Sequence, residues 1–124
     1  KTVSLEEFVE YSKSMFAYWT EDDFASSFRK MLTIEQFRSE EMQGLYQQYL
    51  SSGPAAYVKD LFESMGIAHA EENAVRFYAT MYFYYSVYDG ADDKEKVKNE
   101  FASAIGSMAQ EWIKQPKLTQ IRKS

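Results

Sequence analysis

The 124-residue sequence contains no cysteine and one histidine, and these two shortages exclude several classes of protein. Without cysteine there is no disulfide framework and no thiolate chemistry. A single histidine, His69, cannot supply the two Glu-x-x-His pairs of a di-iron bundle. Catalysis by a Ser/His/acid triad would need that same histidine, and no serine lies in a nucleophile motif. We therefore predict that the chain is not an enzyme and uses no metal or cofactor, and we expect His69 to be a loop residue.

Basic residues are outnumbered by acidic ones, with 14 Lys and Arg against 19 Asp and Glu, so the net charge is −5 and the pI is near 4.9. Binding of nucleic acid requires clustered Lys and Arg against the phosphates. Only the stretch from Lys114 to Lys123 is basic, and we expect residues 116–124 to form a basic tail. This balance weighs against the chain itself being a nucleic-acid-binding surface.

Long hydrophobic runs are also missing. The most apolar stretch, Ala74 to Tyr88, has 15 residues, whereas a membrane-spanning helix needs about 20. No signal peptide is recognisable. Together with the lack of cysteine, this favours a cytoplasmic protein with no membrane partner. The chain starts at Lys1 rather than at Met, so we expect the natural protein to have further residues before it.

Aromatic residues, by contrast, are abundant at 17%. They are densest in Ala74–Tyr88, where twelve of the fifteen residues are apolar or aromatic and five are tyrosines. Asp89-Gly90 is a helix-stop signal, so the stretch reads as a helix rather than a long strand. With 3.6 residues per turn, its bulky side chains point to nearly all sides of the helix. We therefore expect this helix to be covered on more than one side, by the rest of the chain or by a second protein molecule.

The remaining periodicity predicts an all-α domain of about six helices and no strand. The expected helices span about 5–19, the early twenties to 38, 40–50, 54–65, 71–89 and 94–114. Expected N-terminal caps are Ser4 with Glu7, Thr20 with Asp23, Ser39 and Asp92. Pro54 falls in the first turn of the fourth helix, where proline is tolerated.

Two of these helices have faces that predict how they pack. In the second helix, Phe24, Phe28, Met31 and Leu32 form the expected inward stripe. The last helix has one stripe of large residues, Val97, Phe101, Ile105, Met108 and Trp112, and an adjacent stripe of mostly small ones, Ala102, Gly106, Ala109 and Ile113. Small residues at that spacing permit the close approach of another helix.

Several segments together resemble the C-terminal domain of TetR-family transcriptional regulators. Arg29–Leu50 reads RKMLTIEQFRSEEMQGLYQQYL and is followed by Gly53-Pro54. Further on come Phe77-Tyr78 and Val87–Gly90 (VYDG), and then a long final helix. The resemblance covers nearly the whole chain in order and spacing, and it assigns residues 1–115 to one domain. It implies an all-helical domain that binds a small effector and forms a homodimer, in which the last two helices of each subunit make a four-helix bundle.

The same resemblance implies which residues form the two sites. The expected pocket lining is Phe16, Trp19, Phe28, Met31, Leu32, Phe62, Met65, Tyr78, Met81, Tyr82 and Tyr85. The expected dimer interface is Phe83, Val87, Ala102, Gly106, Ala109 and Ile113. Such a pocket suits an apolar or aromatic effector held by a few hydroxyls. Arg76 is the only charge inside the aromatic helix and would pair with an acidic effector or, more simply, with a nearby carboxylate.

The N-terminal helix-turn-helix domain of that family is absent from this sequence, so operator DNA would be a partner only of the missing part. We expect the chain to be the effector-binding and dimerisation portion of such a regulator. The alternative is a helical protein–protein interaction module whose aromatic residues are plain core. A closed core leaves no room for a ligand, so a cavity separates these two hypotheses.

Overall fold

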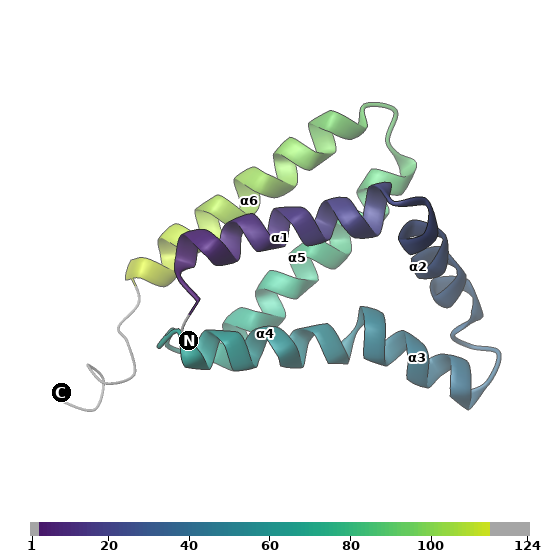
Figure 1. The fold of residues 1–124 in the computed structure, drawn as a ribbon, viewed down its shortest axis with the longest axis horizontal. Helices are drawn as coiled ribbons and strands as arrows, with labels where there is room; N and C mark the ends of the chain where they lie inside the picture. The colour runs from purple at the N-terminus through teal and green to yellow at the C-terminus, as the bar shows by residue number, and fades with distance from the viewer. Residues whose placement is uncertain (1–2, 115–124) are drawn as a thin grey trace.

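A computed structural model of the protein describes residues 3–114, and every regular element in that part of the chain is an α-helix (Figure 1). The helices are α1 (Leu5–Glu21), α2 (Asp23–Glu35), α3 (Glu40–Leu50), α4 (Ser52–Ser64), α5 (Ala70–Gly90) and α6 (Lys94–Lys114). The predicted all-α fold with six helices is confirmed. Lys1 and the basic tail predicted for residues 116–124 lie outside the described residues. Within those described, no helix is both long and apolar enough to cross a bilayer.

The central helix is α5, which contacts α1, α4 and α6. In Figure 1, α1 and α6 lie along one side of α5, and α3 and α4 run one after the other along the opposite side. The short helix α2 closes one end of the molecule, where it connects α1 to α3. At the other end, the start of α1 lies beside the end of α6 (Figure 1). As a result α1 faces α3 and α4, and α5 packs against both α1 and α4.

The start of α1 is fixed by the predicted capping box. The Ser4 hydroxyl accepts from the Glu7 backbone N–H at 3.1 Å, and the Glu7 carboxylate accepts from the Ser4 N–H at 2.9 Å. Two backbone donors that the first turn leaves unpaired are thereby satisfied. Ser39 caps α3 in the same way, as predicted, by accepting from Met42.

We expect Ser4→Ala to lower the free energy of unfolding by about 1 kcal/mol, because it removes the acceptor for the Glu7 N–H. Urea unfolding followed by circular dichroism would measure the change. Ser14→Ala, an exposed position inside the same helix, is the matched control and should be neutral or slightly stabilising. Equal stability of the two variants would contradict a role for the cap.

Two predicted caps are wrong by one or two residues. The cap of α2 is Asp22, whose carboxylate accepts from the Ala25 N–H at 2.9 Å. Thr20 instead belongs to the buried end of α1 and donates its hydroxyl to the Phe16 carbonyl at 2.7 Å. At the start of α6, Asp93 rather than the neighbouring Asp92 accepts from a first-turn N–H. Runs of adjacent cap-forming residues explain both errors, since each offers several acceptors in a row.

The main core lies between α1, α4, α5 and α6 and is built mostly of aromatic rings. Phe8 contacts Phe62, Phe77 and Trp112 at ring-centroid distances of 5.0–6.0 Å. Further along α1, Phe16 stacks on Phe101 at 4.3 Å. A smaller cluster of Leu32, Tyr46 and Leu50 joins α2 to α3. Phe8 meets Phe62 and Trp112 edge to face, and both this geometry and the stacking of Phe16 are arrangements that aromatic pairs prefer.

The predicted inward stripe of α2 is right for Leu32 and in part for Phe28, which packs beside it, but wrong for its other two residues. Phe24 is 74% exposed and Met31 is also exposed, whereas the buried residues of α2 are Ala25, Arg29 and Leu32. The helix is therefore rotated so that a charged side chain faces inward. The reason is the ion pair that Arg29 makes across the fold with Asp89, which a hydrophobic pattern does not reveal.

The aromatic helix α5 is covered on more than one side, as predicted, because α1, α4 and α6 all pack on it. Its cover is not complete: Tyr82 and Phe83 are exposed, and Phe83 retains 59% of its accessible surface. The helix is preceded by His69, which has a left-handed backbone conformation (φ 55°, ψ 47°) and gives α5 no side-chain cap. The prediction that His69 lies in the loop before α5 is confirmed.

Candidate ligand-binding cavity

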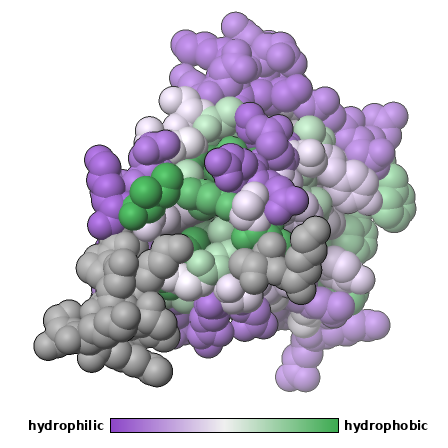
Figure 2. All heavy atoms as spheres, turned by 60° about the vertical axis from the view of Figure 1, so that its left-hand side comes forward, coloured by the Kyte–Doolittle hydropathy of each residue, from purple (hydrophilic) through white to green (hydrophobic). Residues whose placement is uncertain are grey.

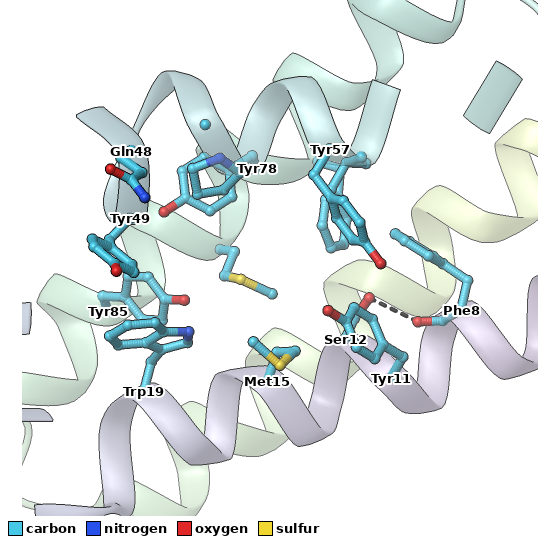
Figure 3. Close-up of a pocket in the computed structure, with 15 residues that line it drawn as sticks. Phe8, Tyr11, Ser12, Met15, Trp19, Gln48, Tyr49, Tyr57, Tyr78 and Tyr85 are labelled. Carbon is cyan, nitrogen blue, oxygen red and sulfur yellow. Dashed lines mark hydrogen bonds between the residues drawn. The ribbon is translucent and has the colours of Figure 1, made fainter. Parts of the chain in front are cut away.

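A cavity of about 240 Å³ lies between α1 on one side and α3, α4 and α5 on the other (Figure 3). It is slightly smaller than the roughly 300–1,000 Å³ of pockets for drug-sized ligands, so it suits a compact molecule. Its lining consists of Phe8, Tyr11, Ser12, Met15, Trp19, Gln48, Tyr49, Gly53, Pro54, Tyr57, Val58, Phe77, Tyr78, Met81 and Tyr85.

One face of α1 forms the floor of the cavity. Residues 8, 12, 15 and 19 recur at spacings of four, three and four, which places them in a row along the helix. Ser12 is the buried polar member of this row, and its hydroxyl donates to the Phe8 carbonyl at 2.8 Å (Figure 3). The donor of Ser12 is therefore used within the helix.

The opposite wall comes from α5, through Tyr78, Met81 and Tyr85, and all three are buried. The Tyr78 hydroxyl donates to the Leu50 carbonyl at 2.5 Å and so ties α5 to the end of α3. Tyr85 stacks on Phe16 with an interplanar angle of 9°. Burial raises the pKa of both tyrosine hydroxyls, so each stays protonated at neutral pH.

The junction of α3 and α4 brings backbone close to the cavity. A Cβ at Gly53 would overlap the Gln48 carbonyl oxygen, so glycine permits this close approach. Pro54 follows in the first turn of α4, as predicted. The half-exposed Tyr11 and Tyr57 lie on α1 and α4. Burial raises the pKa of Tyr11, and the neighbouring Tyr57 hydroxyl adds to that shift.

The lining contains no charged side chain. A cation, Arg29, lies beside one wall, with its guanidinium carbon 4.9 Å from the centre of the Tyr85 ring. It is already engaged, because it donates to both Asp89 carboxylate oxygens and to the Trp19 carbonyl. In the described part of the chain, no group of His, Asp and Glu side chains could hold a metal ion.

Four of the eleven predicted pocket residues line the cavity: Trp19, Tyr78, Met81 and Tyr85. Phe16, Leu32 and Phe62 are buried in the core instead. Phe28 stacks between Trp19 and Phe24, and Met31 is exposed on α2. The Tyr82 hydroxyl pairs with that of Tyr46.

Met65 lies in a different depression, at the end of the molecule where α1 begins and α6 ends (Figure 2). This end depression has a volume of about 430 Å³. Figure 2 shows apolar side chains gathered there and surrounded by polar ones. Its apolar lining is Val3, Leu5, Met65, Ile67, Trp112 and Ile113.

Sequence reasoning missed Tyr11, Tyr49 and Tyr57, which bring hydroxyl groups to the cavity. Tyr49 and Tyr57 recur with the apolar residues of their helices, and that pattern does not tell a residue that borders a void from one in the closed core. A signal was nevertheless present for Tyr11, because it lies one helical turn before Met15, which belongs to the row of inward residues on α1.

Most of the predicted interface residues border two separate grooves, one on each side of α6. Phe83 and Val87 border a surface groove of about 530 Å³ between α5 and α6. Gly106, Ala109 and Ile113 border a separate groove between α1 and α6, of about 290 Å³. Ala109 is buried within the subunit. Ala109 therefore packs inside the subunit, whereas Gly106 has open space beside it, since a Cβ there would meet no atom within 4 Å.

Arg76 has the simpler of its two expected roles. Its guanidinium pairs with the Glu72 carboxylate at 2.7 Å, one turn earlier on the exposed side of α5. It does not belong to the cavity lining.

Comparison of the chain with family models, with curated proteins and with solved structures finds no match in any of the three.

Proposed function

We propose that this chain is the effector-binding and dimerisation portion of a TetR-like transcriptional regulator, and that a small apolar or aromatic ligand occupies the cavity. The observation that carries the proposal is the cavity itself, an aromatic and uncharged space beside the central helix. Aromatic walls with a few hydroxyls are typical of pockets for small organic ligands. The sequence resemblance supplies the regulatory role, in which the ligand would alter operator binding by a helix-turn-helix domain outside this chain.

The position of the cavity supports a regulatory role. Residues of α1 form its floor, and α1 is the element that would follow a DNA-binding domain in the chain. A ligand shifts a conformational equilibrium only if it binds the two states unequally. A ligand held between α1 and α5 meets that condition if α1 moves relative to α5 between the states.

One observation favours the alternative of a protein–protein interaction module. Phe24, Ile34 and Phe37 are strongly exposed on or beside α2. Ile34 and Phe37 are three residues apart at the end of this helix, and exposed apolar residues that lie together can mark a site where another protein docks. The two functions differ in whether the cavity takes up a small molecule.

Native mass spectrometry of the purified chain tests the proposal. We expect a dimer that carries additional mass of a small organic compound, or that takes up an added flat compound such as 2-acetylnaphthalene. A protein that never carries a bound compound would favour the interaction module instead.

We expect Met15→Trp to weaken binding of 2-acetylnaphthalene at least about tenfold, because the larger side chain fills part of the floor of the cavity. Titration calorimetry would measure the affinity. Met31→Trp is the matched control, since Met31 is exposed on α2 and outside the lining, and it should bind as the wild type does. Equal affinities of the two variants would place the binding site elsewhere.

A further inference from the structure

We propose that the cavity selects an uncharged aromatic compound by its carbonyl-type oxygen, which accepts hydrogen bonds from the Trp19 indole N–H and the Tyr85 hydroxyl. This inference rests on the proposed function and deepens it, because it names the chemical class of the ligand and the two groups that recognise it.

The Tyr85 hydroxyl is the first of these groups. Tyr85 is only 4% exposed, and its ring is fixed by stacking on Phe16 and by the guanidinium of Arg29. Every fully buried side-chain nitrogen and oxygen among the described residues has a hydrogen-bond partner. The Tyr78 hydroxyl has one in the Leu50 carbonyl, whereas the Tyr85 hydroxyl keeps some accessible surface and is open to the cavity. In Figure 3 the hydroxyl points into the cavity. A hydroxyl that reaches the cavity can donate to a ligand there without breaking a hydrogen bond inside the protein.

The second group is the indole nitrogen of Trp19, which can only donate. Figure 3 shows it on the edge of the ring that faces the interior, on the same side as the Tyr85 hydroxyl. Arg29 links the two residues, because it donates to the Trp19 carbonyl at 3.0 Å and lies over the Tyr85 ring. Trp19 is further held by Phe28, at a ring-centroid distance of 6.5 Å. Both donors are thus placed before any ligand arrives.

A carbonyl oxygen matches this pair because it has two lone pairs and can accept from both donors at once. The hydroxyl remains a donor, since burial raises the pKa of Tyr85 although Arg29 acts in the opposite direction. A carboxylate would also accept, but it would enter an uncharged lining, and Arg29 behind the Tyr85 ring already binds Asp89. Burying an unpaired charge is costly, so the geometry favours the neutral acceptor.

The rest of the lining sets the shape of the ligand. Met15 and Met81 lie on opposite walls, from α1 and α5, and Phe8 and Phe77 lie further along the cavity. Flat aromatic rings fit between such walls, and thioethers make favourable contacts with them. A fused bicyclic aromatic ketone is the simplest compound that combines this shape with a carbonyl oxygen.

Three probes of nearly equal shape test the proposal: 2-acetylnaphthalene, 2-isopropylnaphthalene and 2-naphthoate. The first has the neutral acceptor, the second lacks it, and the third carries a charge in its place. We expect the ketone to bind about tenfold more tightly than the hydrocarbon, as one or two net hydrogen bonds would give, and more tightly than the carboxylate. Calorimetry would measure the three affinities.

Nuclear magnetic resonance provides a direct readout of the indole donor. The chain has two tryptophans, so a spectrum of the ¹⁵N-labelled protein has two indole N–H signals, and Trp19→Phe identifies one of them. We expect the ketone to move the Trp19 signal downfield, as a new hydrogen bond would, and the hydrocarbon to leave it near its original position.

Tyr85→Phe tests the hydroxyl. We expect it to reduce the preference for ketone over hydrocarbon about threefold or more while leaving binding of the hydrocarbon unchanged. Tyr18→Phe is the matched control, because Tyr18 is an exposed tyrosine of α1 outside the cavity lining, and it should keep the full preference.

The outcomes separate this inference from the proposed function. If ketone and hydrocarbon bind equally and Met15→Trp weakens both, the cavity binds ligands but the donor pair does not select them. Tighter binding of naphthoate would overturn the preference for a neutral ligand. If no probe binds and the purified chain carries no bound compound, the proposed ligand-binding function is wrong, and this inference is wrong with it.

Discussion

Replacing Asp89 with alanine should lower the free energy of unfolding by about 3 kcal/mol, among the largest effects expected of a single substitution in this fold. Asp89 accepts from two nitrogens of Arg29 at 2.8 and 2.9 Å. Arg29 is only 4% exposed, so the substitution leaves a buried cation without a counter-ion. The side chain of Asp89 is 28% exposed, which admits some water and places the effect at the low end of the range for buried pairs.

Urea unfolding would measure this change, with Glu72→Ala as the matched control. Glu72 also pairs with an arginine, Arg76, but both of these side chains are more than half exposed. Exposed pairs contribute about 0–1 kcal/mol, so the control should have nearly wild-type stability. A loss of less than about 1 kcal/mol in Asp89→Ala would mean that Arg29 finds other partners or reaches solvent.

A second substitution in the same protein separates the effect of the unpaired charge from the effect of lost packing. Arg29→Met removes the cation and keeps an unbranched side chain of similar length. In the double variant Arg29→Met with Asp89→Ala no buried charge remains, so we expect it to be more stable than Asp89→Ala alone. If the double variant is the less stable one, the hydrogen bond from Arg29 to the Trp19 carbonyl matters more than the unpaired charge.

The fold was predictable from local signals because most helices here have clear ends and one apolar face. Ser4 with Glu7 and Ser39 mark helix starts by chemistry that depends only on neighbouring residues. Phe8 and Phe16 on α1 recur at helical spacing and are buried as that spacing predicts. Such signals need no knowledge of the tertiary arrangement.

The orientation of α2 was not predictable in this way, because one long-range interaction decides it. Arg29 and Asp89 are 60 residues apart, and nothing in the local pattern indicates that they pair. Turning Arg29 inward also turns Phe24 out to solvent, against the hydrophobic pattern of the helix. The predicted pocket therefore contained α2 residues that belong elsewhere.

The cavity was predictable only where two requirements coincide. Trp19 and Tyr85 lie on inward faces of their helices and also at a place where the walls do not meet. Phe16 and Phe62 lie on equally inward faces, but other rings fill the space beside them. Whether a buried position borders a void depends on the volumes of residues from several helices, which a single helical pattern does not contain.

We expect Phe83→Glu to weaken self-association at least about a hundredfold, because the proposed dimer places the α5–α6 surface of one subunit against that of the other. Phe83 is 59% exposed and borders the surface groove with Val87, Ser103 and Ala104. In a two-fold interface each substitution introduces two carboxylates, which would lose water without gaining a cation. Sedimentation equilibrium would measure the dissociation constant. Val75→Glu, which changes a similarly exposed residue of α5 outside this groove, should leave it unchanged.

Gly106→Leu tests the other side of α6 without disturbing the subunit. A Cβ at Gly106 meets no atom within 4 Å, and leucine is the better helix former, so the variant should fold at least as well as the wild type. If helices of two subunits approach closely along Ala102 and Gly106, the larger side chain separates them and the protein sediments as a monomer. If Gly106→Leu remains a dimer and Phe83→Glu does not, the interface lies on the α5 side alone, and the small residues of α6 take no part in it. A wild-type dimer that both variants preserve would contradict the proposed four-helix bundle.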